Sequence, residues 1–269
     1  MPDYNATLIG RIDITPQLVI LQVRPDESVP DFTPGQYMVL GLLPEAPRLP
    51  EATPVEDAPT ATNGKMIRRA YSISSGSRQR DFLEFYVSLV SNGELTPRLF
   101  AMKAGDRLFV GPRAKGMFTV NDLPPDANLL MVATGTGLAP YISMLRTNVL
   151  EGRGRKVAVL HGASYSWDLG YRGELEGLSR VRNNFAYLPV VSRPEVDRDW
   201  QGRTGRLPSW LENPALAEGC GFPLSPTTAH VFLCGNPGMI EQAEAVLTAR
   251  GYVVDERGTA GTLHREKYW

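Results

Sequence analysis

The hydrophobic pattern changes near Pro125, and this change limits the folds open to the 269-residue chain more than any other feature. Before it, short β-rich runs are separated by turn residues such as Pro-Gly at 34–35 and Gly-Asp at 105–106. Several short strands at such intervals predict an antiparallel β-barrel. One helix is expected at TPRLFAM, where Thr96 can cap and Pro97 can take the first helical position. The expected strands lie in LIGRI, LVILQV, QYMVLGL, AYSIS, FLEFYVSLV and RLFVG.

After Pro125 the chain alternates apolar runs with helical segments, which predicts a parallel sheet covered on both faces. The predicted fold class is β plus α/β, with an N-terminal antiparallel β-barrel over residues 1–122 and a Rossmann-like parallel-sheet domain over residues 123–269. Residues 44–65 are rich in Pro, Ala, Thr and acidic side chains without an apolar period, so we expect an inserted surface loop there. The strand and helix pairs are NLLMVA with LAPYISMLRTNVL, KVAVLHGA with YRGELEGLSRV, FAYLPVV with RLPSWLEN, and HVFLCG with MIEQAEAVLTARG.

Composition excludes several classes of function. The 28 Lys and Arg residues are balanced by 29 Asp and Glu residues, so no surplus of positive charge exists to bind a nucleic acid backbone. Two cysteines are too few for a disulfide framework and lack the close spacing of a metal-binding motif, and the three histidines are far apart in sequence, so no metal site is predicted. No apolar stretch approaches the roughly 20 residues that cross a bilayer, and the N-terminus lacks a signal-peptide pattern. We therefore expect a cytoplasmic, monomeric protein without a membrane or nucleic acid partner.

Two glycine turns follow predicted strands of the second domain. In ATGTGLAP, Gly135 and Gly137 allow a ligand to approach the backbone, and the following helix offers amides and a positive dipole end for phosphate. The turn lacks the spacing of the common nucleotide-binding fingerprints, and a tight turn also needs glycine for structural reasons alone. In FLCGNPGM, Cys234 ends a strand similarly, so both turns should line one crevice. Cys234 could equally be a small buried core residue.

The segment RRAYSIS combines a cation, an aromatic ring and hydroxyl groups on one predicted strand. Because side chains alternate along a strand, Arg69, Tyr71 and Ile73 should share one face while Ser72 points the other way. Such a strand suits a ligand with phosphate and an aromatic ring. It could also be an ordinary barrel strand whose arginine extends into solvent.

The motifs RRAYSIS, ELTPRL, ATGTGLAPY, FLCGNPGM and a C-terminal Tyr-Trp occur in one order. This ordered set resembles the bacterial ferredoxin/flavodoxin–NADP reductases over nearly the whole chain. The resemblance implies an FAD-binding barrel followed by an NADP-binding domain, with FAD and NADPH as cofactors. It also implies hydride transfer between nicotinamide C4 and flavin N5, with ferredoxin or flavodoxin as the redox partner.

The resemblance also implies a role for individual residues. Arg69 would hold the FAD pyrophosphate and Tyr71 would stack on the isoalloxazine ring. The catalytic pair would be Ser72, near flavin N5, and Cys234, beside nicotinamide C4. The FAD set is Arg69, Ala70, Tyr71, Ser72, Val87, Glu94, Leu95, Thr96, Thr136, Tyr268 and Trp269. The NADP set is Gly135, Gly137, Ala163, Ser164, Ser192, Arg193, Arg206, Gly235, Asn236, Pro237, Gly238 and Met239.

Two departures from the family pattern concern the grip on the 2′-phosphate. Close relatives often have a further arginine where Ser164 stands, which predicts a weaker preference for NADPH over NADH. Extra residues precede Arg206, so Arg203 could take its place. Two other functions stay open: an NAD(P)H-dependent flavin reductase serving another electron-transfer system, and a nucleotide- or flavin-binding sensor without turnover.

Overall fold

Backbone contacts divide the chain into two units, and each unit is built from two separate segments of the sequence. The computed structural model describes residues 4–52, 65–151, 154–256 and 259–267. The first unit combines Met1–Thr119 with Ala139–Thr147, and the second combines Val120–Leu138 with Asn148–Trp269. The second half of the chain therefore contributes one helix to the first unit. Among the described residues, no helix has the length and apolar character needed to cross a bilayer.

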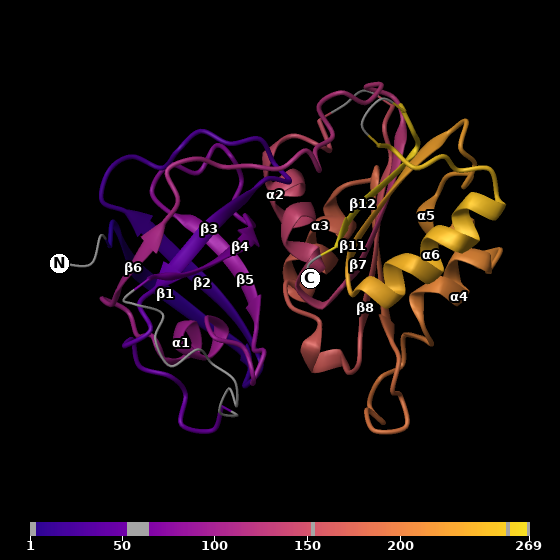
Figure 1. Cartoon of the computed structure of the whole chain (residues 1–269). Helices are drawn as coiled ribbons and strands as arrows, with labels where there is room; N and C mark the ends of the chain where they lie inside the picture. Colours follow the sequence, from indigo (N-terminus) through magenta and orange to yellow (C-terminus); the bar gives the residue numbers. More distant parts are fainter. Residues whose placement is uncertain (1–3, 53–64, 152–153, 257–258, 268–269) are drawn as a thin grey trace. The chain divides into compact units, whose positions relative to one another are not determined.

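Alternating apolar residues build one antiparallel sheet in the first unit. Met38 and Leu40 of β3 are at most 1% exposed and belong to a core shared by all six strands. The strand order is β4–β3–β6–β1–β2–β5 (Figure 1). An isolated bridge joins Ile73 to Phe85 beyond β4, so the sheet is barrel-like without a continuous closing ladder. The strands are β1 (Ala6–Thr15), β2 (Leu18–Pro25), β3 (Tyr37–Leu42), β4 (Ile67–Ser72), β5 (Leu83–Ser88) and β6 (Arg107–Val110).

Helix α1 (Thr96–Ala101) forms where expected, but Thr96 does not cap it. Leu95 is the N-cap residue, and Pro97 lies in the first turn. The Thr96 hydroxyl accepts a hydrogen bond from the Val90 amide at 3.0 Å and donates one to the Val90 carbonyl at 3.1 Å. The predicted capping role is therefore wrong, because this hydroxyl closes the loop between β5 and α1.

The beginning of the 44–65 segment packs against the same helix. The Leu49 amide donates to the Pro97 carbonyl at 3.1 Å, and the Ala46 and Leu49 side chains pack against the core of the first unit. The described start of the expected surface loop is therefore anchored to the first unit. Residues 53–64 lie outside the described part of the structure.

Helix α2 (Ala139–Thr147) is held in the first unit by polar contacts. The Ser143 hydroxyl donates to the Ser75 carbonyl at 2.8 Å. Arg146 Nη1 lies 2.6 Å from Glu84 Oε1, and the Glu84 side chain is only 6% exposed. A buried carboxylate requires a charged or hydrogen-bonding partner, so this ion pair fixes where the helix can sit on the sheet.

The second unit is a parallel six-stranded sheet, as the strand–helix alternation predicts. Its order is β10–β9–β8–β7–β11–β12, and every neighbouring pair is parallel. Leu130 and Val132 of β7 join a core with residues of α4, α5 and α6 on one face, while α3 covers the other (Figure 1). The elements are β7 (Asn128–Thr134), η1 (Gly135–Leu138), β8 (Val157–Ala163), η2 (Ser166–Asp168), α3 (Arg172–Val181), β9 (Phe185–Val191), β10 (Arg203–Thr204), α4 (Leu207–Glu212), α5 (Ala215–Cys220), β11 (Ala229–Gly235), α6 (Pro237–Ala249) and β12 (Leu263–Lys267).

Removing the partner of the buried carboxylate should destabilise the protein. Arg146→Met should lower the free energy of unfolding by about 2–3 kcal/mol, because Glu84 would stay buried after losing the positive charge of Arg146. A fully buried pair would lose more, but the Arg146 side chain is 30% exposed. The double variant Glu84→Gln/Arg146→Met should regain most of the loss. Urea unfolding measures both, and equal losses in the two variants would contradict a role for the ion pair.

Candidate functional site

The two glycine turns lie side by side at the carboxyl ends of β7 and β11. These strands are paired neighbours, with Ala133 opposite Cys234. A Cβ atom on Gly137 would lie 2.4 Å from the Cys234 carbonyl oxygen and 2.7 Å from the Gly235 Cα atom. Position 137 therefore requires glycine because two backbones touch there, with or without a ligand.

Gly135 differs from Gly137 because it opens into free space. Its φ is +52°, in the left-handed region that favours glycine. No heavy atom lies within 4 Å of the position that a Cβ would occupy, apart from its chain neighbours. The 3₁₀ turn η1 begins here, and α2 starts only at Ala139. Gly135 is thus the part of this turn where a phosphate can approach the backbone.

The turn after β11 uses its polar groups internally. The Asn236 amide donates to Thr134 Oγ1 at 2.9 Å, and the Asn236 side chain caps α6 by accepting the Met239 amide at 3.2 Å. Cys234 is completely buried, and Thr136 is 8% exposed. Contact between a ligand and the Cys234 thiol therefore requires a neighbouring group to move.

Four residues of the predicted NADP set meet where β8 and β9 end. The Ser192 amide donates to the Ala163 carbonyl at 3.0 Å, and the Arg193 amide donates to the Ser164 carbonyl at 3.1 Å. The Ser192 and Arg193 side chains are exposed, whereas Ser164 is half-buried. This edge therefore offers one guanidinium and two hydroxyl groups to an anionic ligand.

Arg206 approaches the same edge through β10. The Gly205 amide donates to the Val191 carbonyl at 3.0 Å, which places Arg206 beside the end of β9. Arg203 is engaged elsewhere, because its guanidinium carbon lies 5.8 Å from the centre of the Trp210 ring. Of the two arginines that the sequence left open, Arg206 has the better position and an exposed side chain.

Strand β4 carries the second predicted cluster. Tyr71 lies opposite Met38 and packs partly against the core, while Ser72 lies opposite Tyr37 and is 6% exposed. Burial along β4 does not alternate, because Arg68, Arg69 and Ala70 are all exposed, so the predicted alternation of faces stays a prediction. Burial raises the pKa of the Tyr71 phenol well above its usual value, and the charge of Arg69 acts in the opposite direction.

Arg69 lies where β4 meets solvent, with 58% of its side chain exposed. Its Nη2 atom is 3.5 Å from Glu94 Oε2, and its Nη1 atom donates to the Arg68 carbonyl at 2.8 Å. The structure thus brings together two residues of the predicted FAD set. An exposed pair at this separation contributes little to stability, so a phosphate group can displace Glu94.

An open groove of about 540 Å³ adjoins Arg69 in the first unit. Four of its nine lining residues are basic, and Arg68 lies over the Phe109 ring at 4.3 Å from the centroid. This groove was not predicted from the sequence, although the basic pair around Ala114 in GPRAKG was a signal for it. The lining residues are Val39, Arg68, Arg69, Ala70, Phe109, Gly111, Pro112, Arg113 and Lys115.

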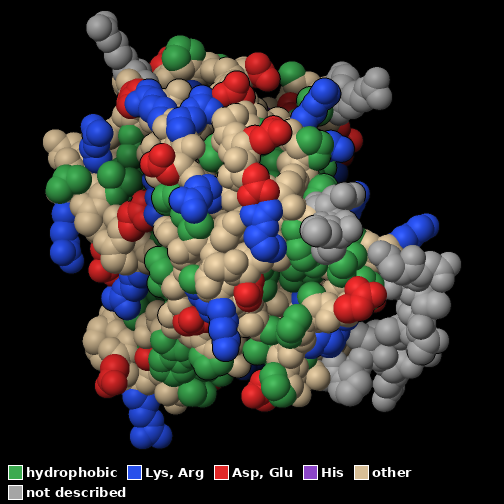
Figure 2. Space-filling view, turned by 90° about the vertical axis from the view of Figure 1, so that its left-hand side faces the viewer, with side chains coloured by type: hydrophobic (Ala, Val, Ile, Leu, Met, Phe, Trp, Pro, Cys, Tyr) green, Lys and Arg blue, Asp and Glu red, His purple; other side chains and the backbone are tan. Residues whose placement is uncertain are grey.

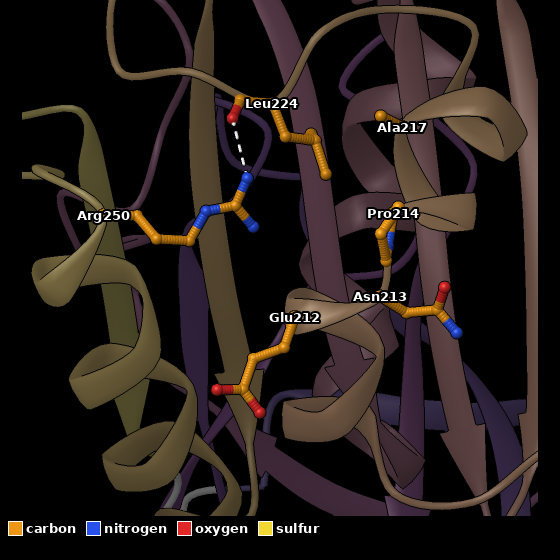
Figure 3. Close-up of a pocket in the computed structure, with 6 residues that line it drawn as sticks. All are labelled: Glu212, Asn213, Pro214, Ala217, Leu224 and Arg250. Atoms are coloured by element: carbon orange, nitrogen blue, oxygen red, sulfur yellow. Dashed lines mark hydrogen bonds between the residues drawn. The ribbon is translucent and has the colours of Figure 1, made fainter.

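A second pocket, of about 380 Å³, lies between α4, α5 and α6 (Figure 3). Its arginine, Arg250, donates to the carbonyls of Leu211 and Leu224, so this guanidinium already has partners. Glu212 ends α4 and Arg250 follows α6, which places the pocket at the edge where parallel strands begin. Nucleotides bind at the opposite edge of such sheets, so this pocket is a poor candidate for the functional site.

Two further residues of the predicted FAD set have buried side chains. Val87 and Leu95 are at most 2% exposed and belong to the core, so only their backbone could take part. Tyr268 and Trp269 lie outside the described residues. Within the described part of the chain, no three His, Cys, Asp or Glu side chains gather to hold a metal ion.

Comparison with known proteins agrees with this arrangement. Residues 131–245 match the family described as "Oxidoreductase NAD-binding domain". The chain is 31% identical over 252 residues to a flavodoxin/ferredoxin–NADP reductase of Buchnera aphidicola subsp. Baizongia pistaciae, covering 93% of each protein. It is 34% identical over 214 residues to the flavodoxin/ferredoxin–NADP reductase of Escherichia coli (strain K12), covering 79% of this chain and 77% of that protein.

A solved structure has the same fold. The crystal structure of a ferredoxin NADP+ reductase from Neisseria gonorrhoeae with bound FAD and NADP superposes with a TM-score of 0.83, at 24% identity and 98% coverage of each chain. A barrel-like sheet followed by a parallel sheet with glycine turns at its carboxyl edge defines a two-unit oxidoreductase with an NAD-binding domain. The chain belongs to the flavodoxin/ferredoxin–NADP reductase family. The predicted fold class and family are confirmed.

The two glycines of the first turn should respond differently to substitution. Gly137→Ala should lower the free energy of unfolding by about 3 kcal/mol or more, because its Cβ would overlap the Cys234 carbonyl. Gly135→Ala should cost about 1–2 kcal/mol, since only its left-handed backbone is strained. Urea unfolding compares them, and a Gly137→Ala variant as stable as Gly135→Ala would refute the close approach.

Proposed function

We propose that this chain is an FAD-dependent oxidoreductase that passes electrons between NADPH and a ferredoxin or flavodoxin. Residues 1–122 would bind FAD, and residues 123–269 would bind NADPH. The observation that carries the proposal is the open Gly135 turn at the carboxyl edge of the parallel sheet, in a chain of this family. Bound flavin would accept two electrons from NADPH and release them singly to a one-electron carrier.

The residues of the first unit fit FAD. The Arg69 guanidinium is exposed beside Ala70 on β4, so it can bind a pyrophosphate. Tyr71 follows Ala70 on the same strand and offers an aromatic ring, and burial raises the pKa of its phenol. Ser72 follows on the same strand and is proposed to orient the reactive edge of the flavin.

The residues of the second unit fit a phosphorylated dinucleotide. Gly135 would receive the pyrophosphate, while Arg193 and Arg206 would hold the 2′-phosphate with help from Ser192. Cys234 is proposed to shape the nicotinamide pocket from the end of β11. Its burial supports an apolar packing role for the thiol rather than a nucleophilic one.

An absorption spectrum separates this proposal from its rivals. The purified protein should be yellow, and NADPH should bleach it under anaerobic conditions. A colourless protein that binds NADPH would support the sensor. A yellow protein that NADPH bleaches, but that reduces neither ferredoxin nor flavodoxin, would support a flavin reductase of another electron-transfer system.

Preference for NADPH over NADH should depend on Arg193. Arg193→Ala should weaken NADPH binding about tenfold or more, because it removes a charged hydrogen bond to the 2′-phosphate. NADH binding should change little, since NADH lacks that phosphate. Steady-state constants of the variant with both nucleotides measure this, and equal losses with NADPH and NADH would overturn the assignment.

The basic groove of the first unit is proposed to attract an acidic carrier protein. Figure 2 shows basic, acidic and apolar side chains interspersed on one face of the molecule. The formal net charge is −1 at pH 7, so attraction of an acidic protein must come from a local basic cluster. Arg68, Arg113 and Lys115 form such a cluster. Complementary charges accelerate the encounter of two proteins, and salt screens them.

Reversing two of these charges should therefore slow carrier reduction. Arg113→Glu/Lys115→Glu should lower kcat/KM for the carrier about tenfold or more at low salt, and less at high salt. Reduction of a small dye should not change. The control Arg24→Glu/Lys103→Glu makes the same charge change at exposed positions outside the groove. Equal effects of the two double variants would show that only net charge matters.

A cytoplasmic, monomeric protein is part of the proposal. Neither Cys220 nor Cys234 forms a disulfide, and both are buried, which suits a reducing compartment. Sedimentation analysis of the holoenzyme tests the oligomeric state.

A further inference from the structure

An aromatic stack borders the predicted 2′-phosphate site. Tyr165 and Trp167 lie in the segment after β8, with ring centroids 4.7 Å apart and planes inclined by 17°. Trp167 is 50% exposed, and it is the only aromatic side chain among the exposed large apolar residues in the described part of the chain. Exposure of an indole ring to water is unfavourable, and covering the ring with a ligand removes this apolar surface from water.

Hydrogen bonds hold this stack in place. The Ser166 amide, between the two rings in sequence, donates to Asp197 Oδ2 at 2.6 Å, and Asp197 is only 4% exposed. The Asp168 amide donates to the Tyr165 carbonyl at 3.1 Å and closes the η2 turn. A rigid aromatic surface loses little conformational entropy when it binds a ligand.

Arg193 is tied directly to the stack. Its Nη1 atom donates to the Tyr165 hydroxyl at 3.2 Å, and its guanidinium carbon lies 5.9 Å from the centre of the Tyr165 ring. The candidate phosphate-binding cation and the aromatic surface are therefore parts of one structure. In a 2′-phosphorylated adenosine the base and the phosphate are attached to the same ribose, so neighbouring groups must recognise them.

We propose that the exposed face of Trp167 stacks on the adenine base of NADPH, with Tyr165 supporting the indole and Arg193 binding the adjoining 2′-phosphate. This assignment rests on the proposed function and adds Trp167 as a residue that determines nucleotide affinity. The free energy of stacking a base on an aromatic side chain depends little on the other parts of the ligand and requires no charged side chain. It supplies binding free energy at the edge where Ser164 has no charge to offer.

The test measures binding of 2′,5′-ADP, which contains the base and the 2′-phosphate but no nicotinamide, to the holoenzyme by calorimetry. Trp167→Ala should raise the Kd about 5- to 20-fold. Trp167→Phe should stay within about threefold of the wild type, because a ring remains for stacking. Val253→Ala removes an equally exposed apolar side chain, 51% exposed and remote in sequence, and should leave the Kd unchanged.

The outcomes distinguish this inference from the proposed function. Reduction of the flavin by reduced nicotinamide mononucleotide (NMNH), which carries a hydride but lacks adenine, should be the same in Trp167→Ala and the wild type. A Trp167→Ala variant that binds 2′,5′-ADP within twofold of the wild type would overturn the stacking, even if NADPH still bleaches the flavin. Slower carrier reduction with unchanged nucleotide binding would also overturn it, and would assign Trp167 to carrier docking. Failure of NADPH to bleach the wild-type flavin would instead overturn the proposed function.

Discussion

The close approach of Gly137 to the backbone of Cys234 and Gly235 constrains both the turn after β7 and the turn after β11. A Cβ at position 137 would lie 2.4 Å from a carbonyl oxygen, so the turn after β7 and the turn after β11 can approach only because no side chain separates them. This approach leaves Gly135 as the open part of the first turn. The same chain then enters α2, which the Arg146–Glu84 pair fixes in the first unit. One glycine therefore determines the geometry of the candidate phosphate site and the start of the next helix.

Some charged side chains are held in buried ion pairs and others make exposed contacts, and only the exposed ones can change partners easily when a ligand binds. Glu84 is buried and paired at 2.6 Å, so breaking that pair leaves a charge with insufficient solvation. Arg69 is exposed and faces Glu94 at 3.5 Å, and Arg193 is exposed beside the Tyr165 hydroxyl. Exposed contacts of this kind contribute little free energy. These two guanidinium groups can therefore exchange their present partners for phosphate at low cost, whereas Arg146 cannot.

The sequence predicts those strands and helices whose apolar residues recur with a clear period. It does not predict a strand that forms only because it pairs with a neighbouring strand. All six strands of the first sheet and the central strands of the second were predicted, because alternating or continuous apolar runs have one favourable arrangement. β12 was not predicted, since LHREK is polar and becomes a strand only through its ladder with β11. The site shows the same limit. Arg69 and Glu94 could be named from the motifs, but their ion pair, and the groove that joins Arg68, Phe109 and Lys115, depend on strands distant in sequence.

If Trp167 stacks on adenine, affinity and selectivity for the nucleotide have separate sources. Adenine is common to NADPH and NADH, so stacking stabilises both complexes equally and cannot discriminate between them. The 2′-phosphate occurs only in NADPH, so discrimination must come from Arg193 and Arg206. With Ser164 in place of a further cation, fewer charges favour NADPH while the indole maintains binding of either nucleotide. The expected result is a site whose affinity depends less on salt than a three-arginine site, and whose preference for NADPH is smaller.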